Sequence, residues 1–313
     1  MITLAQMKYI VNLDETRNFS ESARLCGVTQ PTLSMQIKKA EDLLNMVIFD
    51  RDKNPIIPTI KGEEIIRQCR RVLKESSFFE NLNNDLNEVQ GEFHLGIIPT
   101  IAPYLIPLFI KNFEKKYPKL KLFIKERQTH EIIKELKNEK LDFGILATPL
   151  NDDQLYEQVL YYEPFSFFLN DKHSFLSMKS INLNGLNKET IYHLEDGHCL
   201  RFQSEQICGR VSGKINQSIS LVGGQLETLV NLTKKFGGMT LVPELFVNYL
   251  SKADKNLVRP IEGKKPSREV SLVTSRYFAK EAIGQILETE ILHSLPSNIY
   301  SLKKNEVKII PIA

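Results

Sequence analysis

The chain has 313 residues, 42% of them hydrophobic and 25% charged, with a formal net charge of +3 at pH 7. These values are ordinary for a globular protein of two or three domains. No stretch approaches the ~20 apolar residues of a membrane span, and residues 1–6 do not begin a secretory signal, so we expect a cytoplasmic protein without a membrane partner. The four cysteines include no Cys-x-x-Cys pair, so we expect no disulfide framework, no metal and no cofactor.

Residues 1–58 have the pattern of an all-α winged helix-turn-helix domain. Apolar residues at helical spacing follow Ser20 and Thr29, and we expect each of these two residues to cap the N-terminus of a helix. Gly27 is suited to end the helix that lies between them. Short apolar runs between residues 47 and 58 predict a hairpin that forms the wing.

The third helix and the wing carry polar side chains that suit DNA recognition. Hydroxyl and amide groups hydrogen-bond base edges and phosphates in the major groove. The candidate DNA-binding residues are Gln30, Pro31, Thr32, Ser34, Gln36, Lys38, Arg51 and Lys53. Residues 1–90 hold 12 Lys and Arg against 13 Asp and Glu, a balance of −1, so the prediction rests on pattern and not on charge. The alternative from spacing alone is a three-helix bundle with a solvated polar face.

Several segments of this region together resemble a known family. The runs at residues 19–23, 28–34 and 37–41, followed by residues 49–51 and 58–62, are similar to the winged helix-turn-helix of LysR-type transcriptional regulators. The resemblance implies that a dimer binds double-stranded promoter DNA, with one helix-turn-helix unit on each half-site.

A single long helix is predicted over residues 59–89. Apolar residues recur every three or four positions from Ile65 through Cys69 and Val72 to Leu86, a stripe that suits a helix–helix seam. A helix of ~30 residues spans roughly 45 Å, so we expect a partner chain along it; the alternative is packing against its own domain. LysR-type proteins dimerise through a similar helix, and the resemblance implies a homodimer or homotetramer.

Beyond residue 91, alternating strands and helices predict an α/β domain. The predicted strands are 92–98, 120–125, 143–147, 165–169, 219–222, 238–242 and 269–274, and the predicted helices are 102–116, 130–138, 225–235 and 279–295. We expect the last strand and helix to return to the first lobe of a two-lobed, periplasmic-binding-protein-like domain with a ligand cleft between the lobes. The expected domains are 1–58 for DNA binding, 59–90 for the linker helix and 91–313 for regulation. Within the last, lobe I covers about 91–162 and 268–300, and lobe II about 163–267.

Cys199 is the best candidate nucleophile in the chain. The thiolate form of cysteine attacks electrophiles, and neighbouring cationic groups lower a cysteine pKa below its free value of about 8.5. His198 and Arg201 lie close to Cys199 in the sequence, so we expect them to lower its pKa. Cys26 and Cys69 occupy apolar positions of predicted helices and are expected to be small buried hydrophobes.

A further cysteine, Cys208, follows Cys199 nine positions later. On a helix the two residues would lie about 13.5 Å apart along the axis and on opposite faces. A disulfide needs Cα atoms within roughly 4.4–6.8 Å of each other. If this segment is helical when reduced, a disulfide between the two cysteines requires the segment to refold.

Three more residues lie at expected element boundaries. Thr100 follows a predicted strand and Thr129 precedes a predicted helix, so each is first of all a candidate N-cap. Capping is compatible with contacting a ligand, because helix N-termini carry spare N–H groups. Arg268 lies near a lobe boundary and is by default a solvated charge.

The regulatory half resembles the peroxide-sensing members of the LysR family. The resemblance is carried by residues 96–105, 128–130, 194–201, 220–229 and 238–243. It implies that Cys199 is the peroxidatic cysteine and Cys208 the resolving one. The implied peroxide-binding or activating residues are Thr100, Thr129, His198, Arg201 and Arg268. The chain departs from the family at Phe202, where an acidic residue is common, around residues 207–210, and in the tail 297–313, which has no firm counterpart.

We therefore expect a DNA-binding regulator, not an enzyme, in which hydrogen peroxide reversibly oxidises Cys199 and a Cys199–Cys208 disulfide changes promoter binding or activation. RNA polymerase and a thiol reductant such as glutaredoxin or thioredoxin are the further partners that this function implies. Two alternatives stay open. One is a LysR-type regulator whose cleft binds a small organic effector without redox chemistry, and the other is a thiol peroxidase with an appended domain.

Overall fold

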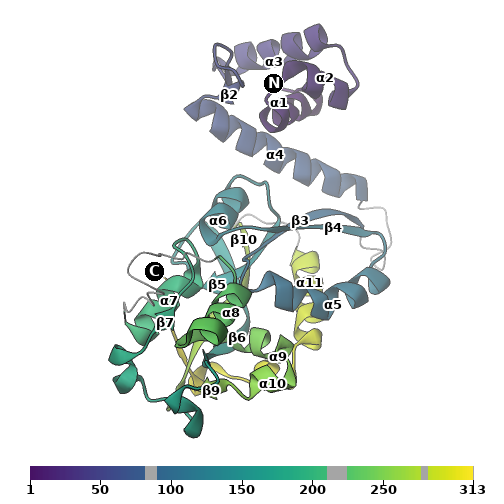
Figure 1. The fold of residues 1–313 in the computed structure, drawn as a ribbon. Coiled ribbons are helices and arrows are strands. Elements are labelled where there is room, and N and C mark those ends of the chain that lie inside the picture. Colours follow the sequence, from purple (N-terminus) through teal and green to yellow (C-terminus); the bar gives the residue numbers. More distant parts are fainter. Residues whose placement is uncertain (82–89, 210–223, 276–280, 313) are drawn as a thin grey trace. The chain divides into compact units, whose positions relative to one another are not determined.

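The computed structural model describes residues 1–81, 90–209, 224–275 and 281–312, which form two compact units (Figure 1). The first unit contains α1 to α4, and the second contains β3 to β11 with the helices between them. No helix in these described ranges is long and apolar enough to cross a membrane.

The first unit has the predicted helix-turn-helix and wing. Its elements are α1 (Leu4–Thr16), α2 (Phe19–Cys26), α3 (Gln30–Leu44), β1 (Phe49–Asp50), β2 (Ile57–Pro58) and α4 (Ile60–Asn81). Gly27, with φ of 68°, ends α2, and the Thr29 hydroxyl caps α3, both as predicted. The cap predicted at Ser20 is wrong, because the N-cap lies two residues earlier, at Asn18, whose carboxamide oxygen accepts hydrogen bonds from the Ser20 and Glu21 amides.

The α4 helix contributes to the core of its own unit. Ile66 and Cys69 are buried there together with residues of α1 and α3, while Val72 is exposed. Burial raises the pKa of the Cys69 thiol to about 11. The first turns of the predicted apolar stripe therefore pack within the unit, and residues 82–89 of the predicted helix lie outside the described residues. Cys26 is only half-buried, and its sulfur accepts a hydrogen bond from the Asn12 amide.

The second unit is the predicted α/β domain, and its described residues contain nine strands of one sheet. The strands are β3 (Gly91–Ile97), β4 (Leu120–Glu126), β5 (Phe143–Thr148), β6 (Leu155–Leu169), β7 (Ile191–Tyr192), β8 (Met239–Pro243), β9 (Val258–Pro260), β10 (Lys265–Ser275) and β11 (Val307–Ile309). The order is β4-β3-β5-β10-β6-β8-β7, with β11 beside β10 and β9 beside β6. The predicted strand at 219–222 lies outside the described residues.

Two long antiparallel strands, β6 and β10, connect the two lobes. The sequence predicted only the last third of β6, because Glu157, Gln158 and the Glu163–Pro164 pair interrupt the apolar pattern before it. The β10 strand returns to pair with β5 in the first lobe, as predicted, and pairs with β6 from Ser267 to Ser275. This register places Arg268 directly opposite Glu163.

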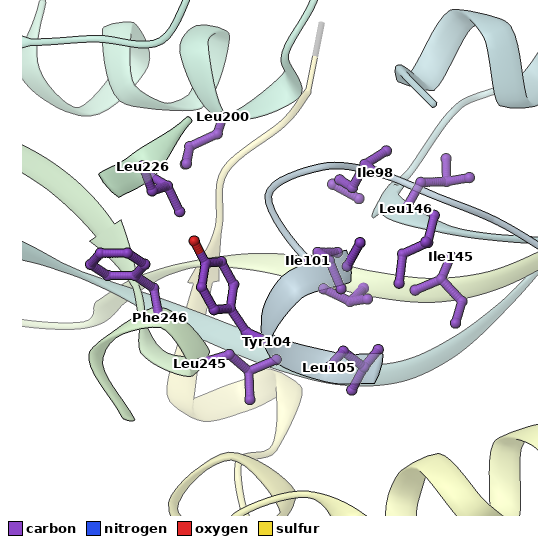
Figure 2. Packing of buried hydrophobic residues seen from close by; sticks show 14 of the residues in the cluster. Ile98, Ile101, Tyr104, Leu105, Ile145, Leu146, Leu200, Leu226, Leu245 and Phe246 are labelled. Carbon is purple, nitrogen blue, oxygen red and sulfur yellow. The ribbon is translucent and has the colours of Figure 1, made fainter. Parts of the chain in front are cut away.

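Helices cover the sheet on both sides. In the first lobe, α5 (Ala102–Lys116) and α11 (Glu281–Ser294) pack together on one face, and α6 (Thr129–Lys137) lies on the other (Figure 1). The second lobe carries α7 (Cys199–Cys208), α8 (Leu226–Phe236), α9 (Glu244–Tyr249) and α10 (Lys252–Lys255). Leu200 of α7 and Leu226 of α8 point toward the Tyr104 ring from α5, which packs edge-on against Phe246 (Figure 2).

The C-terminal tail is part of this domain. After α12 (Ser297–Tyr300), β11 adds a parallel strand to β10, from Lys265 opposite Val307 to Ser267 opposite Ile309. The Ile310 amide then donates to the Ser267 carbonyl at 2.9 Å, which continues the pairing. The tail therefore runs along β10 toward the region of Arg268.

Candidate functional site

Cys199 is the first residue of α7. His198 precedes it in an extended conformation as the N-cap residue, and its side chain makes no capping hydrogen bond. Gly197 has φ of 97°, a backbone conformation that favours glycine, and a Cβ there would lie 2.6 Å from the end of the flexible Gln128 side chain, which would have to shift. The spare N–H groups and positive dipole end of α7 lie next to the Cys199 sulfur, an arrangement that favours the thiolate.

The Thr129 hydroxyl contacts Cys199 across the cleft between the lobes. Thr129 is the first residue of α6, and its Oγ1 lies 2.8 Å from the Cys199 Sγ. The sequence favoured an N-cap role for Thr129, but the hydroxyl bonds the sulfur instead. A hydroxyl at this distance can donate a hydrogen bond to a thiolate and stabilise its charge.

Arg268 is buried, with 1% of its surface exposed, so its prediction as a solvated charge is wrong. Its guanidinium forms an ion pair with Glu163, with Nη2 2.7 Å from Oε2, and Glu163 is itself fully buried. It also donates to the Thr100 hydroxyl at 2.9 Å and to the Thr100 carbonyl at 3.0 Å. The N-cap residue of α5 is Ile101, so the Thr100 hydroxyl serves Arg268 and not the helix.

The environment of Cys199 raises the pKa of its thiol above the ordinary value. Burial is the largest cause, and it outweighs the hydrogen bond from Thr129, the charge of Arg268 and the amide of Cys199 itself, all of which lower the pKa. Our expectation that neighbouring cations bring the pKa below its free value is therefore wrong in its net direction. The surroundings combine desolvation with three groups that favour the charged form.

Arg201 and His198, the two cations expected to act on Cys199, have other partners. The Arg201 guanidinium bonds the Glu205 carboxylate at 2.6 Å and the Leu194 carbonyl at 3.1 Å, both within its own segment. His198 is buried, and its Nε2 lies 3.7 Å from a Glu195 oxygen. Both residues still line the pocket that contains Cys199.

Cys208 ends α7 and is buried in the core of the second lobe. The buried face of the helix repeats at three and four positions: Leu200, Gln203, Ser204, Ile207 and Cys208. Burial raises the pKa of the Cys208 thiol to about 12, against a smaller lowering by its hydrogen bond with Ser204. Nine helical steps place the Cα atoms of the two cysteines about 13.5 Å apart along the axis. Both cysteines are free thiols.

A pocket of about 470 Å³ lies in the cleft between the two lobes, beside Cys199. Its lining residues come from α6, from the segment after β5, from the start of α7 and from the tail: Thr129, His130, Ile133, Pro149, Leu150, Asn151, Asp196, Gly197, His198, Cys199, Arg201, Phe202, Glu205, Pro311 and Ile312. Four of the predicted site residues therefore share one pocket. Thr100, Arg268 and Cys208 are not among its described lining residues.

Some residues of this region were missed at the level of sequence. Glu163 stands alone among aromatic and apolar residues of β6, and a carboxylate in such a run signals a buried cationic partner. Pro311 and Ile312 gave no signal, because only the pairing of β11 with β10 brings the tail to the pocket.

The candidate DNA-binding residues lie on α3 and the wing. Gln30, Pro31, Lys38, Arg51 and Lys53 are exposed, and Thr32, Ser34 and Gln36 are half-buried. Met35 was missed; 61% of its surface is exposed, and an apolar side chain of this kind can contact a thymine methyl group.

Several of the predicted DNA-binding residues have partners within their own unit, among them Lys38, 3.1 Å from the Asp42 carboxylate, and Thr32, whose hydroxyl lies 2.8 Å from that of Thr29. The Arg51 guanidinium lies 3.0 Å from the buried Glu41 carboxylate and above the Phe19 ring. Gln36 accepts a hydrogen bond from the buried Gln6 amide. Lys53 lies at the tip of the wing, and its side chain extends from an exposed turn.

Comparison with known proteins agrees with this architecture. The family model described as the LysR substrate binding domain matches residues 86–284, and the bacterial regulatory helix-turn-helix model of the lysR family matches residues 4–63. The chain is 32% identical to the hydrogen peroxide-inducible genes activator of Haemophilus influenzae, over 87% of this chain and 90% of the relative. It is 34% identical to the HTH-type transcriptional regulator EstR of Acinetobacter baylyi, over 88% of this chain and 91% of the relative.

Among solved structures, full-length OxyR C199D from Pseudomonas aeruginosa matches with a TM-score of 0.79 and 29% identity, over 93% of this chain and 98% of that one. The chain therefore belongs to the LysR family of bacterial helix-turn-helix regulators. Within that family it resembles OxyR along nearly its whole length.

Proposed function

We propose that the protein is a transcriptional regulator that senses hydrogen peroxide through Cys199. The observation that carries the proposal is the 2.8 Å contact between the Thr129 hydroxyl and the Cys199 sulfur, at the N-terminus of α7 and on the wall of a pocket. A hydroxyl donor, a helix N-terminus and the charge of Arg268 together stabilise a thiolate in a buried site. The relatives named for hydrogen peroxide support the choice of oxidant.

The chemistry takes two steps. The Cys199 thiolate attacks one oxygen of the peroxide, the O–O bond breaks, and Cys199 becomes a sulfenic acid while hydroxide leaves and is protonated to water. The Cys208 sulfur then attacks the sulfenic sulfur, which forms the Cys199–Cys208 disulfide and releases a second water. Because α7 holds the two thiols at opposite ends of a helix, the second step requires α7 to unwind.

The proposal extends to the rest of the chain. We assign DNA binding to residues 1–58, dimerisation to 59–90 and peroxide sensing to 91–313, in a homodimer or homotetramer. Refolding of α7 changes the packing of the regulatory domain and thereby the position of the DNA-binding helices. A dithiol reductant of the glutaredoxin or thioredoxin kind resets the disulfide by exchange, and RNA polymerase is the further partner that a regulator of promoters implies.

The test combines peptide mapping with DNA footprinting of the full-length protein. Peroxide is expected to yield a Cys199–Cys208 disulfide, while Cys26 and Cys69 stay reduced. Duplexes selected from a random library by the reduced protein are then footprinted before and after peroxide, with Cys199→Ser as the control. A footprint that changes equally in the Cys199→Ser variant contradicts the proposal.

A second candidate function is a regulator whose cleft binds a small organic effector. The pocket volume of about 470 Å³ lies within the usual range for small-molecule sites and far exceeds the size of a peroxide molecule. EstR, a relative of comparable identity, is a transcriptional regulator not named for peroxide. DNA binding that peroxide leaves unchanged in both the wild type and Cys199→Ser would favour this candidate.

A further inference from the structure

The C-terminal tail contacts the helix that contains both reactive cysteines. The Gln203 side chain, fully buried in the middle of α7, donates from Nε2 to the Ile310 carbonyl at 2.9 Å. Ile310 is held in place in turn, because its amide donates to the Ser267 carbonyl beside Arg268. These two hydrogen bonds therefore link the sheet to α7 through Ile310.

The hydrogen bond between Gln203 and Ile310 lies in the part of α7 that must unwind before the two cysteines can meet. Gln203 is four residues after Cys199 and five before Cys208, at the edge of the buried helix face that lies nearer Cys199, while Cys208 lies at the other edge of that face. Its second polar atom, Oε1, is buried without a hydrogen-bond partner, so the Gln203 carboxamide depends on the bond from Nε2 to the Ile310 carbonyl. Breaking it would leave a buried amide and a buried carbonyl unpaired, which is costly.

The same tail closes the pocket. Pro311 and Ile312 line the same pocket as Cys199 and Phe202. Two contacts, one to the helix and one to the pocket, thus join the end of the chain to the thiol site.

We propose that residues 310–312 are a positioning element of the thiol site, which holds α7 helical and must release Gln203 before Cys208 can reach Cys199. The step in which Cys208 reaches Cys199 rests on the function proposed above. The restraint of α7 by the tail does not depend on that function. Gln203 and the tail act on the equilibrium between helical and unwound α7, so they set how often Cys208 becomes accessible.

The test measures alkylation of Cys208 by iodoacetamide in the reduced full-length protein, without peroxide. Buried Cys208 reacts only when α7 opens, whereas Cys69, buried in the other unit, is an internal reference. The variants are Gln203→Ala, a chain that ends at Ile309, and the two combined. Gln206→Ala is the matched control, because Gln206 lies exposed on the same helix.

The loss of the bond is expected to raise the Cys208 alkylation rate about fivefold, the population change that corresponds to ~1 kcal/mol, with no change at Cys69. If Gln203 acts through the tail, Gln203→Ala adds nothing in the shortened chain. Effects that add fully would mean that Gln203→Ala acts through the cavity it creates, and they overturn the proposal. So does a Cys208 rate that is the same in all variants.

Two further measurements keep the outcome clear. If circular dichroism shows that the shortened chain does not fold, hydrogen exchange of the peptide that contains Ile310 becomes the deciding test. Gln203→Ala must speed up this exchange, and Gln206→Ala must not. Trapping of Cys199 sulfenic acid with dimedone after peroxide tests the proposed function separately. No sulfenic acid in any variant, together with faster Cys208 alkylation, refutes the peroxide chemistry and supports the restraint.

Discussion

The Thr129 hydroxyl, from the first turn of α6, lies 2.8 Å from the Cys199 sulfur at the first turn of α7. It joins the two lobes at the reactive atom. It is also the largest of the influences that lower the pKa of this thiol against the effect of burial.

Replacing Thr129 by Val should therefore slow the reaction of Cys199 with peroxide. Loss of one hydrogen bond to a charged sulfur is worth about 1.5–3 kcal/mol, which corresponds to a rate lower by roughly 10- to 150-fold. The measurement is the rate of dimedone-trapped sulfenic acid at fixed pH. Thr129→Ser keeps the hydroxyl and should retain most of the rate, while a Thr129→Val rate equal to wild type would contradict this role.

The raised pKa of Cys199 predicts how its reactivity depends on pH. Since the folded protein favours the neutral thiol, the thiolate fraction at neutral pH is small and grows with pH up to the raised pKa. We expect the rate of sulfenic acid formation to rise by close to tenfold per pH unit between about pH 6.5 and 8.5, as for any thiol below its pKa. A rate that is already constant above pH 7 would mean a pKa below the ordinary value.

The pKa of Cys208 predicts the pH dependence of α7 stability. Its folded value of about 12 lies above the ordinary value of about 8.5, so the unfolded thiol loses its proton first as pH rises. The stability that buried Cys208 contributes is thus fully present below about pH 8.5 and is lost progressively as pH rises toward 12. Over this pH range, hydrogen exchange of α7 peptides should speed up by more than the intrinsic exchange rate does. Cys208→Ala should remove this additional increase.

Arg268→Met should destabilise the regulatory unit strongly. The substitution leaves Glu163 fully buried without its cation, a situation that typically costs about 3–5 kcal/mol. Denaturant unfolding followed in residues 89–313 by hydrogen exchange measures the change. Lys121→Met, which breaks the exposed pair with Glu92, should cost less than about 1 kcal/mol. The double variant Arg268→Met with Glu163→Gln should recover a large part of the loss.

In the DNA-binding unit, replacing Lys53 and replacing Arg51 should change the salt dependence of DNA binding by different amounts. A phosphate contact by one Lys contributes about 0.9 to the slope of log affinity against log salt, so Lys53→Ala should lower that slope by about one per chain. The probe is a 30-base-pair duplex of arbitrary sequence, with Lys264→Ala in the regulatory unit as the control. Arg51→Ala should change the slope less, because Glu41 already neutralises its charge. A larger effect from Arg51 would place this residue on the DNA backbone.

The sequence by itself determined the features that depend on neighbours along the chain. Gly27 and the Thr29 cap mark the helix-turn-helix because a cap and a left-handed residue act within one turn. The nine-residue spacing of Cys199 and Cys208 indicated that a helix would separate them, and α7 covers this span. Alternating apolar runs predicted the α/β domain for the same local reason.

Only the tertiary structure decided what surrounds Cys199. The proximity of Thr129 to the sulfur, the burial that raises the thiol pKa, and the pairing of Arg268 with Glu163 all join residues from 70 to more than 100 positions apart. Sequence neighbours His198 and Arg201 were expected to control the pKa, but helix geometry turns the Arg201 charge toward Glu205. The tail reaches the pocket only because β11 pairs with β10. Desolvation and contacts across lobes arise from packing, and no local pattern encodes them.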